Sequence, residues 1–89
     1  MTEGYRTLRF TPRFISDLIG LPRTEQKQIA KSLKALDENE KTPALRVHEL
    51  QGQLQGIWSA SASKSLRITF VRLDGGYKLL LTVDHHYGD

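Results

Sequence analysis

Hydrophobic and polar residues follow two different periods along the chain. In YRTLRF (5–10) apolar and polar side chains alternate, which predicts a strand. In the following segments apolar residues recur three and four positions apart, which is typical of helices with one buried face. The first such group is Phe14, Ile15, Leu18 and Ile19, and the second is Ile29, Leu33 and Leu36.

Capping residues, proline and glycine set the limits of these helices. Thr11 followed by Pro12 has the form of an N-cap and a first helical residue, and Gly20 ends the first helix. The second helix opens after Pro22 and gives way to the polar loop DENEKTP (37–43). The first half of the chain therefore predicts a strand followed by a two-helix hairpin.

The second half carries strand patterns in place of helical ones. The candidates are residues 56–63, 66–73 and 77–86. The last two are separated by Asp74-Gly75-Gly76, a strong hairpin signal. The order predicts an α+β fold, with an N-terminal strand, a two-helix hairpin and a three-stranded antiparallel meander, and with the helices on one face of the sheet.

Strand periodicity assigns side chains to the two faces of this sheet, because neighbouring residues point to opposite sides. The residues expected to face the helices are Trp58, Ala60 and Ala62, then Leu66, Ile68 and Phe70, and then Leu79, Leu81 and Val83. If no bulge intervenes, the opposite set of the last strand is Leu80, Thr82, Asp84 and His86. Arg67 and His86 are therefore expected to share the face without helices.

The composition is that of an ordinary globular protein, since 38% of the 89 residues are hydrophobic and 26% are charged. The length suits one domain, residues 1–89. The sequence contains no stretch of about 18 apolar residues, the length needed to span a membrane. Its N-terminus has no apolar run of the signal-peptide type. We therefore expect a cytoplasmic protein.

The net charge, the cysteine count and the histidines exclude only a few kinds of partner and site. A net charge of +3 suits a nucleic acid or an acidic protein as partner, but an ordinary basic protein has the same charge. The chain has no cysteine, which excludes disulfides and thiolate metal sites. The adjacent His85 and His86 are a poor metal pair, because neighbouring strand residues point to opposite faces.

Three motifs in the second half resemble the RelE/ParE superfamily of bacterial toxins, and most closely its YoeB and YafQ-like branch. They are HELQGQLQGIWS (48–59), LRITF (66–70) and HHY (85–87). The spacing from His48, through the rest of the first motif, to Arg67 matches the family pattern without a gap. The N-terminal LRFTPRF, followed by a helical hairpin, also fits that pattern.

The resemblance implies the toxin of a type II toxin–antitoxin system, a ribosome-dependent endoribonuclease that cuts mRNA without metal or cofactor. The RNA's own 2′-hydroxyl would be the nucleophile. By resemblance, His48 is the candidate general base, Arg67 grips the scissile phosphate, His86 is the candidate general acid, and Tyr87 stacks on a base or assists proton transfer. The expected partners are the ribosome with its mRNA and an antitoxin that lays a helix or an extended segment across the toxin and covers or distorts its active face.

The sequence departs from the family pattern at two positions. Ser61 stands where close relatives carry an arginine that faces the RNA, so Lys64, Arg72 or the helix residues Lys27, Lys31 and Lys34 would have to compensate. Asp84 stands where a basic or small residue is common. It would either orient a histidine or repel RNA phosphate.

Two other functions are consistent with the same resemblance. A ParE-like protein would poison DNA gyrase by binding alone, but such chains generally lack the set of a base, an arginine and a histidine. A catalytically attenuated member would bind its antitoxin and act only as a co-repressor of transcription.

Overall fold

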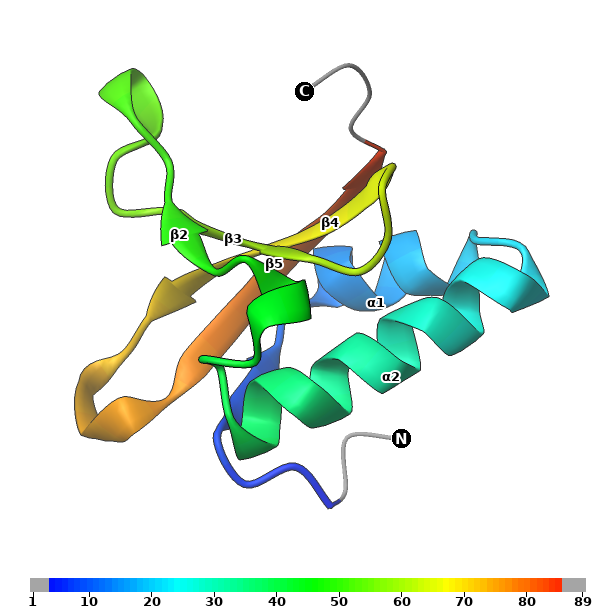
Figure 1. Cartoon of the computed structure of the whole chain (residues 1–89), viewed down its shortest axis with the longest axis horizontal. Helices are drawn as coiled ribbons and strands as arrows, with labels where there is room; N and C mark the ends of the chain where they lie inside the picture. The colour runs from blue at the N-terminus through cyan, green and yellow to red at the C-terminus, as the bar shows by residue number, and fades with distance from the viewer. Residues whose placement is uncertain (1–3, 86–89) are drawn as a thin grey trace.

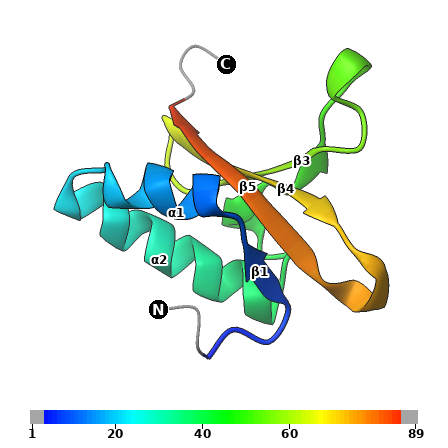
Figure 2. The same cartoon turned by 180° about the vertical axis from the view of Figure 1, so that it is seen from behind.

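The computed structural model describes residues 4–85 and forms two layers, a pair of helices and a sheet (Figure 1). The helices lie along one face of the sheet, as the view from behind also shows (Figure 2). The helices are α1 (Pro12–Ile19) and α2 (Arg23–Glu38), and the strands are β1 (Leu8–Phe10), β2 (His48–Glu49), β3 (Trp58–Ser61), β4 (Leu66–Arg72) and β5 (Lys78–His85). No helix in this range is long and apolar enough to cross a membrane.

The sheet has the strand order β1-β5-β4-β3-β2. β1 runs parallel to β5, and the other pairs are antiparallel. The predicted α+β class, the helical hairpin and the three-stranded meander are confirmed. The sequence pattern did not predict β2, a strand of two residues that places His48 within the sheet, at its edge, whereas we expected His48 to precede the strands.

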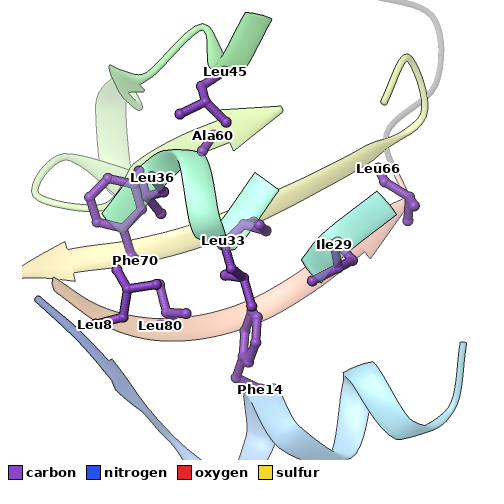
Figure 3. Packing of buried hydrophobic residues seen from close by; sticks show 11 residues of the cluster. Leu8, Phe14, Ile29, Leu33, Leu36, Leu45, Ala60, Leu66, Phe70 and Leu80 are labelled. Atoms are coloured by element: carbon purple, nitrogen blue, oxygen red, sulfur yellow. The ribbon is translucent and has the colours of Figure 1, made fainter. Parts of the chain in front are cut away.

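The buried cluster joins the two layers. Phe14 of α1 and the α2 stripe of Ile29, Leu33 and Leu36 lie against the sheet (Figure 3). The other members are Leu8, Leu45, Ala60, Leu66, Ile68, Phe70 and Leu80. Complete burial of one such leucine or phenylalanine contributes about 1.5–3 kcal/mol. The predicted apolar stripes of both helices are therefore the surfaces that hold the fold together.

A bulge at Leu81 changes the face assignment predicted for β5. Phe70 pairs with Leu80, whereas the preceding Thr69 pairs with Thr82, so Leu81 is left over. Leu80 is therefore fully buried against the helices, and Leu79, which pairs with Val71, stands on the opposite face. Our assignments of Leu80 and Leu79 were both wrong. The predicted positions of Val83 and Asp84 are confirmed, because the bulge restores the expected alternation after it.

Helix α1 covers the part of the β5 edge that β1 leaves unpaired. The Thr11 side chain donates to the Leu80 carbonyl at 2.9 Å and also caps α1 by accepting the Phe14 N–H at 3.0 Å. Further along, the Asp17 carboxylate accepts the backbone N–H of Val83 at 3.1 Å. Side chains of α1 thus satisfy polar backbone groups that would otherwise form an open sheet edge.

The C-terminal end of α2 is tied to the first segment of the chain by Asp37. Its carboxylate accepts the Thr7 hydroxyl and the Thr7 N–H, both at 2.7 Å, and the Arg6 N–H. Partial burial alone would raise the pKa of Asp37, but these hydrogen bonds to the ionised form hold it below its ordinary value.

Glu40 connects the end of α2 to the sheet through two cations. Arg72 donates to its two carboxylate oxygens at 2.6 and 3.1 Å, and Nζ of the buried Lys78 lies 3.7 Å from one of them. The Arg72 guanidinium also lies over the Trp58 ring, 4.1 Å from its centre. The hydrogen bond from Arg72 holds the pKa of Glu40 below its ordinary value, although partial burial opposes the shift.

We predict that Glu40→Gln lowers the free energy of unfolding by about 1 kcal/mol at neutral pH, because two cations lose their counter-charge. The pKa of Glu40 is depressed in the folded state, so its contribution is present above the ordinary glutamate pKa and lost as the pH falls through the folded-state value. The difference from wild type, measured by urea unfolding, should therefore shrink on acidification. Glu38→Gln, at an exposed glutamate nearby, should change little at either pH.

Candidate active site

The sheet face without helices carries two rows of polar side chains. Cross-strand partners stand on the same face, so the register identifies each row. The first row crosses β2, β3, β4 and β5 and consists of His48, Ser59, Thr69 and Thr82. The second crosses β3, β4 and β5 and consists of Ser61, Arg67 and Asp84. The predicted placement of Arg67 on this open face is confirmed.

His48 projects from the edge strand with its ring held from behind. Its Nδ1 lies 2.7 Å from the carbonyl oxygen of Arg46, and a carbonyl can only accept, so Nδ1 must carry the proton. Arg46 has the left-handed backbone conformation, with φ of 47°, which is uncommon for a residue other than glycine. In the neutral ring the lone pair is therefore on Nε2, which makes His48 a competent base.

The loop after β2 is held by its own backbone and by Glu49. The Leu50 N–H donates to the Ile57 carbonyl at 2.8 Å, and the Glu49 carboxylate accepts the Gly56 N–H at the same distance. Gly56 has φ of 95°, a conformation that suits glycine. The loop therefore closes back on β2 and keeps the short strand paired, which holds His48 on the open face.

Arg67 stands near the centre of the open face, and its side chain is 26% exposed. Its Nε is buried and has no hydrogen-bond partner within the described residues, and the Asp84 carboxylate lies 3.6 Å from it. Asp84 in turn accepts a hydrogen bond from the Thr82 hydroxyl at 3.2 Å, and Thr82 Oγ1 lies 2.6 Å from Thr69 Oγ1. Strand periodicity could suggest these two threonines, but their link to Asp84 required the register.

The structure brings some of the other predicted site residues to this face and leaves others elsewhere. Ser61 is the cross-strand neighbour of Arg67, and Lys64 is exposed in the turn between β3 and β4. Arg72 lies on the side of the helices, where it is paired with Glu40, so it does not join Arg67. His86 and Tyr87 lie outside the described residues.

His85 is the last residue of β5 and is exposed at the rim of the sheet. It pairs across the sheet with the buried Leu66, and its Nε2 lies 3.2 Å from the Glu25 carboxylate of α2. The ring thus contacts the helix layer, away from Arg67. Within residues 4–85 no three histidine, aspartate or glutamate side chains are grouped so that they could hold a metal ion.

No protein-family model matches this sequence, and no curated protein is significantly similar to it. Solved structures are similar in fold. A chain of the toxin–antitoxin complex RelBE2 from Mycobacterium tuberculosis has a TM-score of 0.63 at 25% identity, and the match covers 90% of this chain and 96% of that one. YafQ from Escherichia coli has a TM-score of 0.72 at 13% identity, covering 90% and 92%.

The YoeB dimer structure from Staphylococcus aureus has a TM-score of 0.66 at 21% identity, and the match covers 93% of this chain and 99% of that one. The chain has the RelE-like toxin fold. The resemblance that the three motifs indicated is therefore confirmed at the level of the fold. Both helices pack on one side of the sheet (Figure 1), and the cross-strand register puts His48 and Arg67 on the other side.

We predict that His48 and His85 adopt opposite neutral tautomers. His48 should carry its proton on Nδ1, which faces a carbonyl, and His85 on Nε2, which faces a carboxylate. Two-bond nitrogen–proton correlation spectra at about pH 8.5, where histidine is ordinarily neutral, distinguish the two forms. His48→Gln and His85→Gln assign the signals. An Nε2–H tautomer at His48 would contradict the expectation that this residue can act as a base.

Proposed function

We propose that this protein is the toxin of a type II toxin–antitoxin system and acts as a ribosome-dependent, metal-independent endoribonuclease on mRNA. The observation that carries the proposal is the helix-free sheet face of a RelE-like fold, on which the candidate base His48 and the cation Arg67 both lie. An acid–base side chain and a guanidinium on one accessible surface suit phosphodiester cleavage, which needs proton transfer and stabilisation of negative charge.

In the proposed reaction, Nε2 of neutral His48 accepts the proton of the 2′-hydroxyl. The 2′-oxygen attacks the adjacent phosphorus, the bond from phosphorus to the 5′-oxygen breaks, and the products are a cyclic phosphate and a 5′-hydroxyl. The imidazolium formed at His48 keeps its Nδ1–H bond to the Arg46 carbonyl, so the ring can hold its orientation during the transfer.

Arg67 would stabilise the charge that builds on the pentacovalent phosphorus. The planar guanidinium presents paired N–H donors that match two phosphate oxygens, and a partly buried site strengthens that interaction. His48 pairs with Ser59 and Arg67 with Ser61, so on a regular sheet their backbones are two strand spacings apart and offset by two residues, roughly 12 Å in all. Ser59 and Ser61, which stand on β3 between the two strands, have small side chains, so we expect a ribose and its phosphate to lie across β3 between His48 and Arg67.

The departing 5′-oxygen requires a proton, and His86 stays the expected donor by resemblance. Tyr87 stays the expected residue for stacking on a base or for assisting that transfer. Ser61 and Lys64 would contact the RNA beside Arg67. Because Ser61 replaces an arginine, we infer a weaker hold on phosphate than in relatives with a basic residue there.

We predict that induced wild-type protein produces new mRNA 5′ ends within translated codons, and that Arg67→Ala and His48→Ala reduce these cuts by about 10²–10³-fold. The measurement is 5′-end mapping after induction, together with the growth rate. Arg13→Ala is the matched control for Arg67, since it removes the same charge from an exposed position on α1 and should leave cleavage unchanged.

Other outcomes of this experiment would replace the proposal. Toxicity with intact mRNA and with gyrase-dependent DNA breaks would identify a gyrase poison. Normal growth with intact mRNA would leave only antitoxin binding and co-repression. Cuts that persist in Arg67→Ala would remove Arg67 from the chemistry.

An antitoxin is the partner that this function requires, and we propose that it occupies a groove in the helix layer. The groove, of about 380 Å³, is lined by Ile15, Leu18 and Ile19 of α1 and bordered by Arg23 and Lys27 of α2. Ile19 is 67% exposed. An apolar groove with a basic border fits an amphipathic segment that carries acidic residues beside its apolar face.

We predict that Ile19→Glu weakens antitoxin binding by about 10–100-fold, because it removes an apolar contact and adds a like charge. We expect the antitoxin to be a small acidic protein encoded by a neighbouring gene, and calorimetry with that protein measures the loss. Toxicity without antitoxin should persist. Leu73→Glu makes the same change at an exposed leucine after β4 and should bind normally. Equal losses in both variants would place the antitoxin elsewhere.

A further inference from the structure

We propose that Asp84 is a positioning residue, which fixes the direction of the Arg67 guanidinium and at the same time weakens its hold on phosphate. This inference rests on the proposed function for its catalytic consequence, but the positioning itself concerns the protein alone. Three observations carry it: the closeness of the two charges, the hydrogen bonds that hold the carboxylate, and the isolation of Arg67 Nε.

The first observation is the placement of the two charged groups. Arg67 and Asp84 are direct cross-strand partners on β4 and β5, so the sheet keeps their side chains next to each other on the open face. Asp84 Oδ2 lies 3.6 Å from Arg67 Nε, and the Asp84 side chain is 35% exposed. At this distance the two groups form an ion pair, but they are too far apart for a hydrogen bond.

The second observation is a directed pair of hydrogen bonds behind the carboxylate. A threonine hydroxyl has one hydrogen, and Thr82 uses it on Asp84 Oδ2, which can only accept. The bond of 2.6 Å between the two threonines must therefore be donated by Thr69. Thr69 is buried, so its hydroxyl is fixed by the surrounding sheet. The chain from Thr69 through Thr82 ends on Asp84 and restrains the position of its charge.

The third observation is the state of Arg67 Nε. This atom is buried without a hydrogen-bond partner among the described residues, and Asp84 supplies the counter-charge beside it. A guanidinium offers paired N–H groups along its edges, and Asp84 lies nearest to Nε, so it stands beside the edge that Nε shares with one terminal nitrogen. The edge formed by the two terminal nitrogens does not contain Nε, and we expect it to supply the donors that meet a phosphate.

Asp84 has two opposing effects on a bound phosphate. Restraint of the guanidinium favours the geometry of the transition state, and small misplacements of such a group reduce turnover strongly. The negative charge near the phosphate disfavours binding, since like charges repel at this range. Removal of the charge should therefore tighten binding and slow the chemical step together. A residue that only stabilised the fold would not produce this combination.

The first test uses the free protein and does not depend on ribonuclease activity. The exchange of the Arg67 Nε proton with water, followed in nitrogen-15 NMR spectra, reports how well this group is restrained. We expect exchange roughly tenfold faster in Asp84→Asn and in Thr82→Val than in wild type. Thr82→Ser keeps the hydroxyl and should restore slow exchange. An unchanged rate in both Asp84→Asn and Thr82→Val would overturn the positioning role.

The second test measures cleavage of mRNA on programmed ribosomes. For Asp84→Asn we expect kcat to fall roughly tenfold and KM to fall about fivefold, so that kcat/KM changes little. For Thr82→Val, which keeps the charge of Asp84, kcat should fall while KM stays the same, and Thr82→Ser should recover kcat. A kcat that is unchanged or raised in Asp84→Asn would overturn the inference.

The two tests separate failure of the inference from failure of the proposed function. If wild-type protein does not cleave mRNA, the proposed function fails, and the proton exchange of Arg67 still decides whether Asp84 positions it. If wild type cleaves and the exchange rates are unaltered by the variants, the proposed function stands and Asp84 is not a positioning residue. Thermal unfolding of each variant confirms that the fold is retained.

Discussion

The pairing of β4 with β5 is the constraint on which the rest of the structure depends. Phe70 and Ile68 of β4 face the helices and need apolar partners on β5, which are Leu80 and Val83. These partners are three positions apart, whereas a regular strand brings residues two positions apart to one face. The bulge at Leu81 resolves the conflict, and the burial of Leu80 offsets the hydrogen bonds that the irregular ladder loses.

The same register also determines the chemistry of the open face. Beyond the bulge it places Asp84 opposite Arg67 and Thr82 opposite Thr69, which assembles the polar network around the central cation. A slip of one residue would move Asp84 into the helix layer and expose Val83. Core packing at one end of β5 therefore sets the electrostatics of the candidate site at the other end.

The two main groups of the site are supported in different ways. Arg67 belongs to a seven-residue central strand, so its backbone is fixed by partners on both sides. His48 belongs to an edge strand of two residues, and depends on the Arg46 carbonyl and the closed loop behind it. Arg67 is thus more firmly held than His48.

Local sequence signals were sufficient for the helices, the hairpin turn and the face of Arg67. The helix limits at Thr11 and Gly20 and the apolar spacing of the helices depend only on residues nearby in the sequence. The alternation in β4 is regular, so the face of Arg67 follows without knowledge of any distant residue. The resemblance in the motifs also identified the fold. The tertiary structure was needed for Leu80, for the strand at His48 and for Arg72. In each case the position depends on a partner that is not a neighbour in the chain. Leu80 pairs with Phe70 at the bulge, and His48 pairs with Ser59 in the edge strand. Arg72 is bound by Glu40, although strand alternation alone would leave it free to bind RNA.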